Sequence, residues 1–469
     1  MNIRKFVKPG HLFTVVLLAS AAGSITVARA QEAFEVPLGI AGAGIRVSSV
    51  SAWGQFFSSG LPTTSTNSYG GRLPDLGGDE GYGFSTKLAS RFSTGPTTFS
   101  MLYEPSYTGR VRFTQWNAFN QHLGIHVNHQ FSARFHTYLS IEGAQQTLDQ
   151  FLFEPTDTGR LPGGIHTFDE LVKELLAGKI TEAQFSALLT GEHPVSPVQT
   201  LLYGNRLSSI GVHNGYAYQF SPRVDVSFGL SGIHVEHTRN FQDAQHTPLQ
   251  FHLIPRSTSY SGRTALGYTF TPRTRLELSV SESRSLSSFQ NFNILSGVAR
   301  FSTQIGTHWL VHLGGGGGTL RPILNVKTGF ERGNGIRYLA NGGLAYKTLT
   351  QLYMLSSDKS ISEETGFGAN RLVTSGSWNW RQPGQPWGLL SSVSKEDLNR
   401  ANFIKLNAWL ARGGVSRALN RNFQLNLEYA YLSNHSRFQN LLNDVARNSA
   451  RIALVWNGTQ NSPYGGGVY

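Results

Sequence analysis

The sequence predicts an all-β protein: an antiparallel transmembrane β-barrel of about 16–18 strands, with a short helical insertion in one long loop. Three observations support this fold class. The chain begins with an export signal, short segments of alternating polarity recur from about residue 44 to residue 457, and aromatic residues stand beside the short turns between those segments. Such a combination is typical of outer-membrane barrels.

Residues 1–30 read as a cleaved signal peptide. Arg4, Lys5 and Lys8 form a basic start, an apolar stretch follows from Leu12 to Ala22, and Ala28-Arg29-Ala30 precedes the predicted cleavage before Gln31. The apolar stretch is too short for a membrane-spanning helix. We therefore expect export to the cell outer membrane. The mature chain would comprise a periplasmic segment (31–43), the barrel (44–457) and a glycine-rich tail (458–469).

Composition limits the possible functions. The formal net charge is +12, and removal of the signal, with four basic and no acidic residues, leaves +8. Export argues against nucleic acid as the partner, so the charge favours a basic lumen or contact with outer-membrane lipid and lipopolysaccharide. The chain has no cysteine, which excludes disulfides and thiolate sites. The length of 469 residues would allow two or three domains, but no linker divides the repeating segments.

Alternation predicts the strands. Successive side chains of a strand point to opposite faces, so period-two polarity separates a lipid face from a lumen face. Residues 224–230 ("VDVSFGL") and 423–431 ("FQLNLEYAY") place their large apolar side chains on one face. In 404–411 ("IKLNAWLA") the same reading turns Leu406 outward and Lys405 inward, with Trp409 as an exception. Each segment is long enough for a tilted strand to cross a bilayer.

Aromatic residues predict the membrane interface. Rings with an apolar body and a polar edge prefer the boundary between lipid and water, and in barrels they form a girdle at one end of the strands. A soluble β-sandwich could also place aromatics at turns, but the number of segments and the signal argue against it. The expected girdle consists of Phe131, Tyr218, Phe220, Tyr268, Phe270, Tyr346, Trp378, Trp380 and Trp456.

These features resemble the outer-membrane β-barrel, porin-like superfamily of Gram-negative bacteria. The resemblance rests on the signal, the turns at Ser221-Pro222-Arg223 and Thr271-Pro272-Arg273, and a last alternating strand near the C-terminus. It implies insertion by the barrel assembly machinery. Such barrels commonly end on an aromatic residue of the last strand. Here either Trp456 closes the barrel, or the tail "NSPYGGGVY" acts as the assembly signal.

Loop lengths predict the topology, because these barrels have short periplasmic turns and longer outer loops. The short turns are expected near 94–96, 132–133, 221–222, 271–272, 348–350, 383–386 and 420–421. Longer gaps are expected around 58–79, 148–205, 236–257, 357–369 and 433–447. Residues 306–340 are hard to divide, because Gly314–Gly318 suit either a flexible loop or a bent strand.

One long loop, residues 148–205, contains a helical pattern. Within residues 166–193, Thr167 with Glu170 and Thr181 with Gln184 form capping boxes, each followed by apolar residues at helical spacing. Two short helices are therefore predicted. They would either cap the barrel from outside or constrict its lumen, and the sequence leaves both open.

Catalytic chemistry has little support. His234 and Glu236 share a strand face while His237 points the other way, so these residues do not complete a metal site. A hydrolase remains a minor alternative, since nothing places serine, histidine and acid together. The sequence predicts no enzyme activity, no cofactor and no metal.

The lumen-facing residues predict a channel. A barrel of 16–18 strands encloses an aqueous pore. Strand parity predicts a pore lining with eight basic and four acidic residues: Lys87, Arg91, Glu142, Asp225, Arg263, Arg275, Glu277, Lys347, Arg371, Lys405, Glu428 and Arg451. The main hypothesis is a porin that passes small anionic or saccharide solutes. The alternatives are an export pore for an acidic polysaccharide and a non-conducting structural or adhesive barrel. The oligomeric state stays open.

Overall fold

The computed structural model describes most of the barrel. The described residues are 45–58, 78–112, 114, 117–147, 206–237, 256–287, 291–323, 335–362, 368–382, 384–400, 404–420, 422–438 and 441–457. The predicted signal peptide, periplasmic segment 31–43, helices within 166–193 and tail 458–469 lie outside them. In the described part of the chain, no helix is long and apolar enough to cross a membrane.

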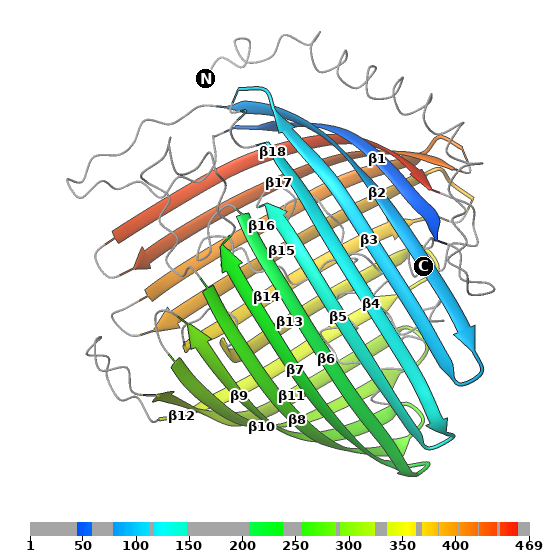
Figure 1. Cartoon of the computed structure of the whole chain (residues 1–469), viewed down its shortest axis with the longest axis vertical. Coiled ribbons are helices and arrows are strands. Elements are labelled where there is room, and N and C mark those ends of the chain that lie inside the picture. The colour runs from blue at the N-terminus through cyan, green and yellow to red at the C-terminus, as the bar shows by residue number, and fades with distance from the viewer. Residues whose placement is uncertain are drawn as a thin grey trace.

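The chain forms one antiparallel sheet of 18 strands, shown in Figure 1. Each strand pairs with the next one along the chain. The strands are β1 (Arg46–Phe57), β2 (Asp79–Thr94), β3 (Thr97–Arg110), β4 (Ala118–Ser132), β5 (Phe135–Thr147), β6 (Arg206–Ser221), β7 (Val224–His237), β8 (Arg256–Thr271), β9 (Thr274–Ser287), β10 (Asn291–Ile305), β11 (Trp309–Ile323), β12 (Ile336–Lys347), β13 (Gln351–Ser362), β14 (Ala369–Arg381), β15 (Trp387–Arg400), β16 (Ile404–Ala418), β17 (Phe423–Phe438) and β18 (Leu441–Asn457).

The sheet closes on itself because β1 pairs with both β2 and β18. On the β18 side the ladder runs from the pair Ser49–Asn457 to the pair Phe57–Ser449. Closure leaves no edge strand with unpaired backbone groups, which is the condition for a sheet to exist inside a membrane. The predicted antiparallel barrel is confirmed, at the upper end of the expected strand number.

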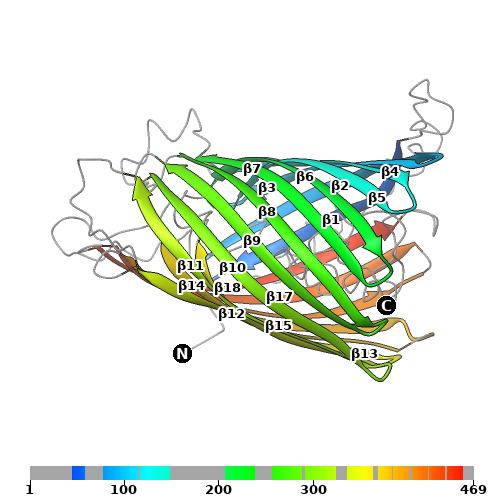
Figure 2. The same cartoon turned by 90° about the horizontal axis from the view of Figure 1, so that it is seen from below.

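Eight tight turns gather at one end of the barrel, the short-turn rim (Figure 2). In five of them a Ser, Thr or Asn side chain accepts backbone N–H groups from the residues that follow. Ser221 Oγ, for example, accepts from Arg223 and Val224. These caps explain the repeated turn sequences, since hydroxyl and amide oxygens mimic a backbone turn. The capping residues are Ser132, Ser221, Thr271, Thr348 and Asn420.

Each short turn is also bonded to the next hairpin. The carbonyl of Arg134, in the turn after β4, accepts the N–H of Gln219 on β6, and Arg223 O accepts from Thr269 in the same way. The pattern repeats at all eight short turns, ending with Asn422 O and the N–H of Asn457. The seven predicted short turns coincide with observed ones. The eighth, at 306–308, turns at Gly306 with a φ of 63°.

Two predictions about loops are corrected or settled. The long gap expected at 433–447 is wrong, because only residues 439–440 separate β17 from β18, and the two strands pair from Phe438–Leu441 onward. Polar side chains interrupt the alternation there while backbone pairing continues. Gly314–Gly318 form part of β11, paired on both sides, so they belong to a strand and not to a flexible loop.

Strand pairing assigns the paired positions to one of two faces, because directly paired residues share a face. Arg275 on β9 reaches Asp225 on β7, two strands away, and side chains converge in this way on the concave side of a barrel. The face of Arg275 and Glu277 is therefore the inner one. The opposite, outer face carries large exposed apolar residues, including Leu266, Leu278, Val280, Leu313, Leu355 and Leu427.

Closure is testable by cross-linking, because the natural chain has no cysteine. Ala52 on β1 pairs directly with Leu454 on β18. We expect the double variant Ala52→Cys/Leu454→Cys to form a disulfide on oxidation, seen as a shift in non-reducing gel mobility. In the control pair Ala52→Cys/Leu427→Cys, the second cysteine lies one strand further, beyond the Cα separation of about 7 Å that a disulfide can span. Cross-linking of the control but not of the first pair would contradict this closure.

Candidate functional site on the inner wall

The structure brings most of the predicted lumen residues onto the inner face. By register, the ten with described side chains on that face are Lys87, Glu142, Asp225, Arg263, Arg275, Glu277, Lys347, Arg371, Glu428 and Arg451. Arg91 takes the register position opposite Ser100 on β3, but its side chain lies outside the described residues.

Lys405 is a correction. Pairing carries the inner face through Glu396 on β15 to Ala408 on β16, so Lys405 and Trp409 lie on the outer face. The sequence interpretation had reversed this strand. Its apolar side chains are buried inside the barrel, where Leu410 packs with Phe57, Ala430 and Leu432. Alternation shows that a segment is a strand, but it does not say which face points inward. Where the inner wall carries an apolar patch, the apolar residues of a strand face inward.

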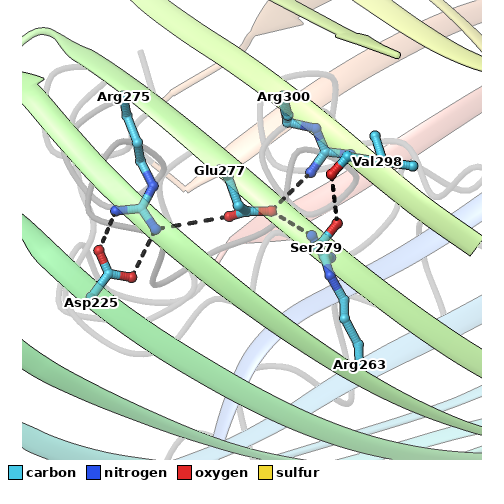
Figure 3. Close-up of polar contacts among 7 residues, drawn as sticks. All are labelled: Asp225, Arg263, Arg275, Glu277, Ser279, Val298 and Arg300. Atoms are coloured by element: carbon cyan, nitrogen blue, oxygen red, sulfur yellow. Dashed lines mark hydrogen bonds and ion pairs between the residues drawn. The ribbon is translucent and has the colours of Figure 1, made fainter. Parts of the chain in front are cut away.

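An ion-pair network crosses β7 to β10 in the half of the wall near the short-turn rim (Figure 3). The Arg275 guanidinium donates two bonds to the Asp225 carboxylate, with Nη1–Oδ1 at 2.6 Å and Nη2–Oδ2 at 2.8 Å. The same Nη2 lies 3.8 Å from Glu277 Oε2. The Arg275 side chain is only 5% exposed. A bidentate pair in such a setting holds both groups in fixed positions.

Glu277 is shared by two further arginines. Arg263 Nη2 on β8 lies 2.5 Å from Glu277 Oε1, and Arg300 Nη1 on β10 lies 3.5 Å from the same oxygen. Their side chains are 36% and 20% exposed. These contacts join three guanidinium groups to two carboxylates. Arg263 and Arg300 are more exposed than Arg275.

Gly267 makes the Arg275–Asp225 bridge possible. This glycine lies on β8 between the two partners, paired with Asp225 on one side and Glu277 on the other. The Arg275 guanidinium lies directly over it, so a Cβ at position 267 would collide with the Nη atoms. The missing side chain leaves a flat passage along the wall for the arginine.

A second charged group lies on β16, β17, β18 and β1. Arg451 pairs directly with Glu428, and its guanidinium stacks over the Trp53 ring at 4.4 Å from the centroid. Arg412 pairs with Ala430 and so shares this inner face two residues from Glu428. Trp53 itself is buried and lies over Gly83, where a Cβ would strike the indole ring. Arginine on an aromatic face keeps its charge while its flat surface is packed.

Nearer the opposite rim, one cluster of inner charges is buried. Arg110 pairs with Asp79 at 3.2 Å, and its guanidinium stacks 3.9 Å from the centre of the Phe57 ring. Arg447 stacks on the same ring at 3.9 Å. Arg110, Arg447 and Phe57 are all buried, so this cluster holds strands together rather than offering charge to a solute. Two further inner-wall ion pairs are Lys87–Glu104 at 3.4 Å and Arg371–Glu396 at 2.7 Å.

Hydroxyl groups line the wall beyond the β7–β10 network, toward the opposite rim. Ser231 and Ser261 bond to each other at 2.5 Å, and Ser281 bonds to Ser296 at 2.7 Å. Each pair joins neighbouring strands on the inner face. This part of the wall therefore combines a fixed charged group with small hydrogen-bonding side chains, which leave room in front of them.

All nine residues of the predicted girdle occupy outer-face positions close to the short-turn rim. Two ring pairs form within this set, Tyr218 with Phe220 at 4.8 Å and Tyr268 with Phe270 at 4.9 Å between centroids. Trp378 stacks on Tyr353, a further outer-face ring, at 6.3 Å. The pairs Tyr218–Phe220 and Tyr268–Phe270 come from the repeated sequences that precede the capped turns. Their role at a membrane interface remains a prediction.

The described residues contain no group of three or more His, Asp or Glu side chains able to hold a metal ion. His234 and Glu236 lie on the outer face, with His234 Nε2 3.7 Å from Glu236 Oε2. His234 Nδ1 also bonds to Thr258 Oγ1 at 2.7 Å. This arrangement is an exposed polar pair at the end of a strand.

Sequence reasoning missed several inner-wall residues. Arg300, which completes the network around Glu277, lies in a segment whose alternation is weak, "GVARFS". Arg412 and Trp53 stand beside glycines and were not assigned a face. Counting alternate positions from the turn at 306–308 places Arg300 on the inner face. Counting from Glu428 through the turn between β16 and β17 does the same for Arg412. The burial of Arg110 and Arg447 has no signal in the sequence.

Comparisons with known proteins return similar folds but no relatives. No family model matches the chain, and no curated protein matches it. Similar solved structures include Pseudomonas aeruginosa OccK2 (OpdF) in complex with glucuronate, at 10% identity over 88% of this chain and 98% of that one, with a TM-score of 0.43. A BenF-like porin from Pseudomonas fluorescens Pf-5 has 11% identity, covers 88% and 99%, and has a TM-score of 0.40. The outer membrane protein OpdK from Pseudomonas aeruginosa has 10% identity, covers 87% and 97%, and has a TM-score of 0.41.

These neighbours include a porin and an outer-membrane protein, the class that the sequence resembles. With identities and TM-scores this low, the likeness says nothing about solutes or site residues. The barrel and its inner wall are therefore interpreted from their own strand pairing and side-chain contacts.

The role of Gly267 gives a matched test. Gly267→Ala should displace the Arg275 guanidinium, break its bidentate contact with Asp225 and lower the free energy of unfolding by about 1–3 kcal/mol. In the control Gly229→Ala, also on the inner face, the new Cβ meets only a carbonyl oxygen at 3.8 Å, so stability should be unchanged or slightly higher. Urea unfolding in detergent measures both. Equal stability of the two variants would show that the bridge does not depend on the glycine.

Proposed function

We propose that this chain is an outer-membrane channel that passes small anionic or saccharide solutes by diffusion. The closed barrel of 18 strands supports the proposal, since barrels of 16–18 strands leave an aqueous channel, whereas about eight strands are filled by their own side chains. The predicted export signal at the start of the sequence supports an outer-membrane location. In this proposal the signal is cleaved before Gln31, and the barrel assembly machinery inserts the mature chain.

The observation that carries the anion preference is the excess of arginine around Glu277. Asp225 pairs with the buried Arg275, while Arg263 and Arg300 both contact the Glu277 carboxylate. Exposed guanidinium groups on a curved low-dielectric wall raise the local concentration of anions and repel cations. Arginine also binds carboxylates and phosphates through paired N–H groups, so these two side chains offer a transient site rather than a uniform field.

The serine pairs beyond the network support a solute that carries hydroxyl groups as well as charge. Hydroxyls both donate and accept hydrogen bonds, so Ser231, Ser261, Ser281 and Ser296 can exchange their mutual bonds for bonds to a sugar. A small acidic sugar would meet hydroxyls toward the opposite rim and arginines near the short-turn rim. Diffusion is favoured over tight binding, because each contact on its own is weak and shared with protein partners.

Ion selectivity tests the proposal. In a planar bilayer under a salt gradient, the unmodified channel should give a reversal potential of the anion-selective sign. The variant Arg263→Gln/Arg300→Gln should move that potential toward cation selectivity, because it leaves Glu277 uncompensated on one side while Arg275 still holds Asp225. The control Arg284→Gln removes one charge from the outer face of β9 and should leave the reversal potential unchanged.

Three results would contradict the proposal. They are cation selectivity of the unmodified channel, equal effects of the inner and outer variants, and no current from protein that is inserted and folded. Gel mobility without boiling verifies the last condition, because a folded barrel resists detergent and migrates differently from the boiled chain.

Location is tested separately. The protein should fractionate with outer membranes, and its mature N-terminus should begin at Gln31 if the export signal is cleaved as proposed. Membrane fractionation followed by N-terminal sequencing measures both. Recovery from the soluble periplasm would reject the membrane location, whatever the conductance of the purified protein.

A further inference from the structure

The outer face of β12–β16 carries a strip of basic and aromatic residues. This basic–aromatic strip consists of Tyr338, Lys359, Leu372, Lys395 and Trp409, one residue from each of five consecutive strands. The strand register makes the strip continuous. Leu372 on β14 pairs with Lys359 on one side and with Asp397 on the other, and Asp397 lies two residues after Lys395 on β15. Lys395 pairs directly with Trp409.

Each lysine of the strip lies against an aromatic ring. Lys359 Nζ is 3.2 Å from the centre of the Tyr338 ring, and Lys395 Nζ is 5.5 Å from the centre of the Trp409 ring. The rings stay open on their other side, since Tyr338 is 68% and Trp409 42% exposed. Contact with the electron-rich ring face holds each ammonium group at the barrel surface instead of letting it extend into water.

Asp397 fixes the position of Lys395 without removing its capacity to bind. The Lys395 ammonium lies 2.8 Å from Asp397 Oδ2, and the other Asp397 oxygen accepts a bond of 2.6 Å from Asn407 Nδ2. An ammonium group has three N–H donors, so one donor to Asp397 leaves others for a ligand. With Lys359, the strip retains an excess of positive charge.

The height of the strip on the barrel is informative. Lys395 lies eight residues beyond Trp387, an outer-face aromatic at the short-turn end of β15. With a rise of about 3.3 Å per residue and a tilt of about 40°, Lys395 is about 20 Å above Trp387 along the barrel axis. The apolar band of an outer-membrane barrel is about 25 Å tall. The strip therefore lies near the upper limit of that band, about 5 Å below the interface opposite the short-turn rim, where an outward lysine costs less than at the midplane.

We propose that the basic–aromatic strip binds the phosphorylated diglucosamine headgroup of lipopolysaccharide. The proposal rests on the outer-membrane location proposed above, in which the leaflet opposite the short turns is the lipopolysaccharide leaflet. Lys359 and Lys395 stand two strands apart, about 10 Å at normal strand spacing, which suits anionic groups carried at the two ends of a sugar pair. Lysine binds phosphate as a point charge, and the exposed rings of Tyr338 and Trp409 can stack on the sugars.

The surface below the strip fits the acyl chains of the same lipid. A groove of about 620 Å³ runs along the outer face of β11–β15, lined by Leu344, Leu355, Val393 and aromatic rings, with Gly376 as part of its floor. Its lining is almost entirely apolar. The charged strip above and the apolar groove beneath match the two parts of one amphipathic lipid, its headgroup and its acyl chains.

The test uses the full chain purified in detergent and titrated with lipid A, with binding measured by native mass spectrometry. The variant Lys359→Gln/Lys395→Gln should bind about 30-fold more weakly, because each lysine at an anionic lipid surface contributes about a fivefold factor in affinity. The control is Arg417→Gln, which removes a cation stacked 4.9 Å over Trp387 on the same outer face but at the short-turn end. This control should bind lipid A as the natural chain does.

Titrations with two other lipids distinguish a phosphate-specific site from general electrostatic attraction. Lipid A without its phosphates should bind the natural chain as weakly as lipid A binds the double-lysine variant. Phosphatidylglycerol should bind the natural chain and the double-lysine variant equally. Unchanged lipid A binding by the double variant would overturn the proposal, as would an equal loss in the Arg417→Gln control. Gel mobility without boiling verifies that each variant is folded.

Failure of this inference and failure of the channel proposal are distinguishable. The two lysines lie on the outer face, so their replacement should leave the reversal potential in a planar bilayer unchanged. A barrel that fails to conduct but binds lipid A through these lysines would contradict the channel and keep the lipid site. A conducting barrel with no lysine-dependent binding would do the reverse.

Discussion

Satisfaction of the backbone is the constraint on which the rest of this structure depends. A strand in a membrane has no water for its N–H and C=O groups, so each strand needs a neighbour on both sides, and β1 must meet β18. Once the sheet closes, the register of every pair is fixed, and register decides which side chains face inward. The grouping of Arg263, Arg275 and Arg300 around Glu277 is a consequence of two pairings made by backbone atoms, β8 with β9 and β9 with β10.

Much of the architecture could be predicted because membrane strands alternate and their turns have characteristic residues. The alternation within residues 224–230 assigned the two faces of β7 correctly, and sequences such as Ser221-Pro222-Arg223 marked the short turns. Both signals are local. They depend on side chains within a few residues of each other, which a single sequence displays directly.

The remainder depends on contacts between strands. Lys405 was assigned to the wrong face because Leu410 packs against Phe57, which is more than three hundred residues away in the chain. The bridge over Gly267 joins β7 to β9 and requires a bare position on β8 in register with both partners. The end of β17 was missed because its side chains become polar while its backbone stays paired. None of these arrangements follows from the period of a strand.

The bonds between consecutive short turns and the hairpins that follow them give the two mouths of the barrel different freedom to evolve. At the short-turn rim a carbonyl such as Arg134 O must meet the N–H of Gln219, so inserting one residue in a turn would displace the acceptor and disturb its neighbour. The connections at the other mouth range from two residues, between β17 and β18, to the long segment between β5 and β6. Changes in loop length are therefore tolerated at one mouth of the barrel, while the other mouth keeps a constant outline.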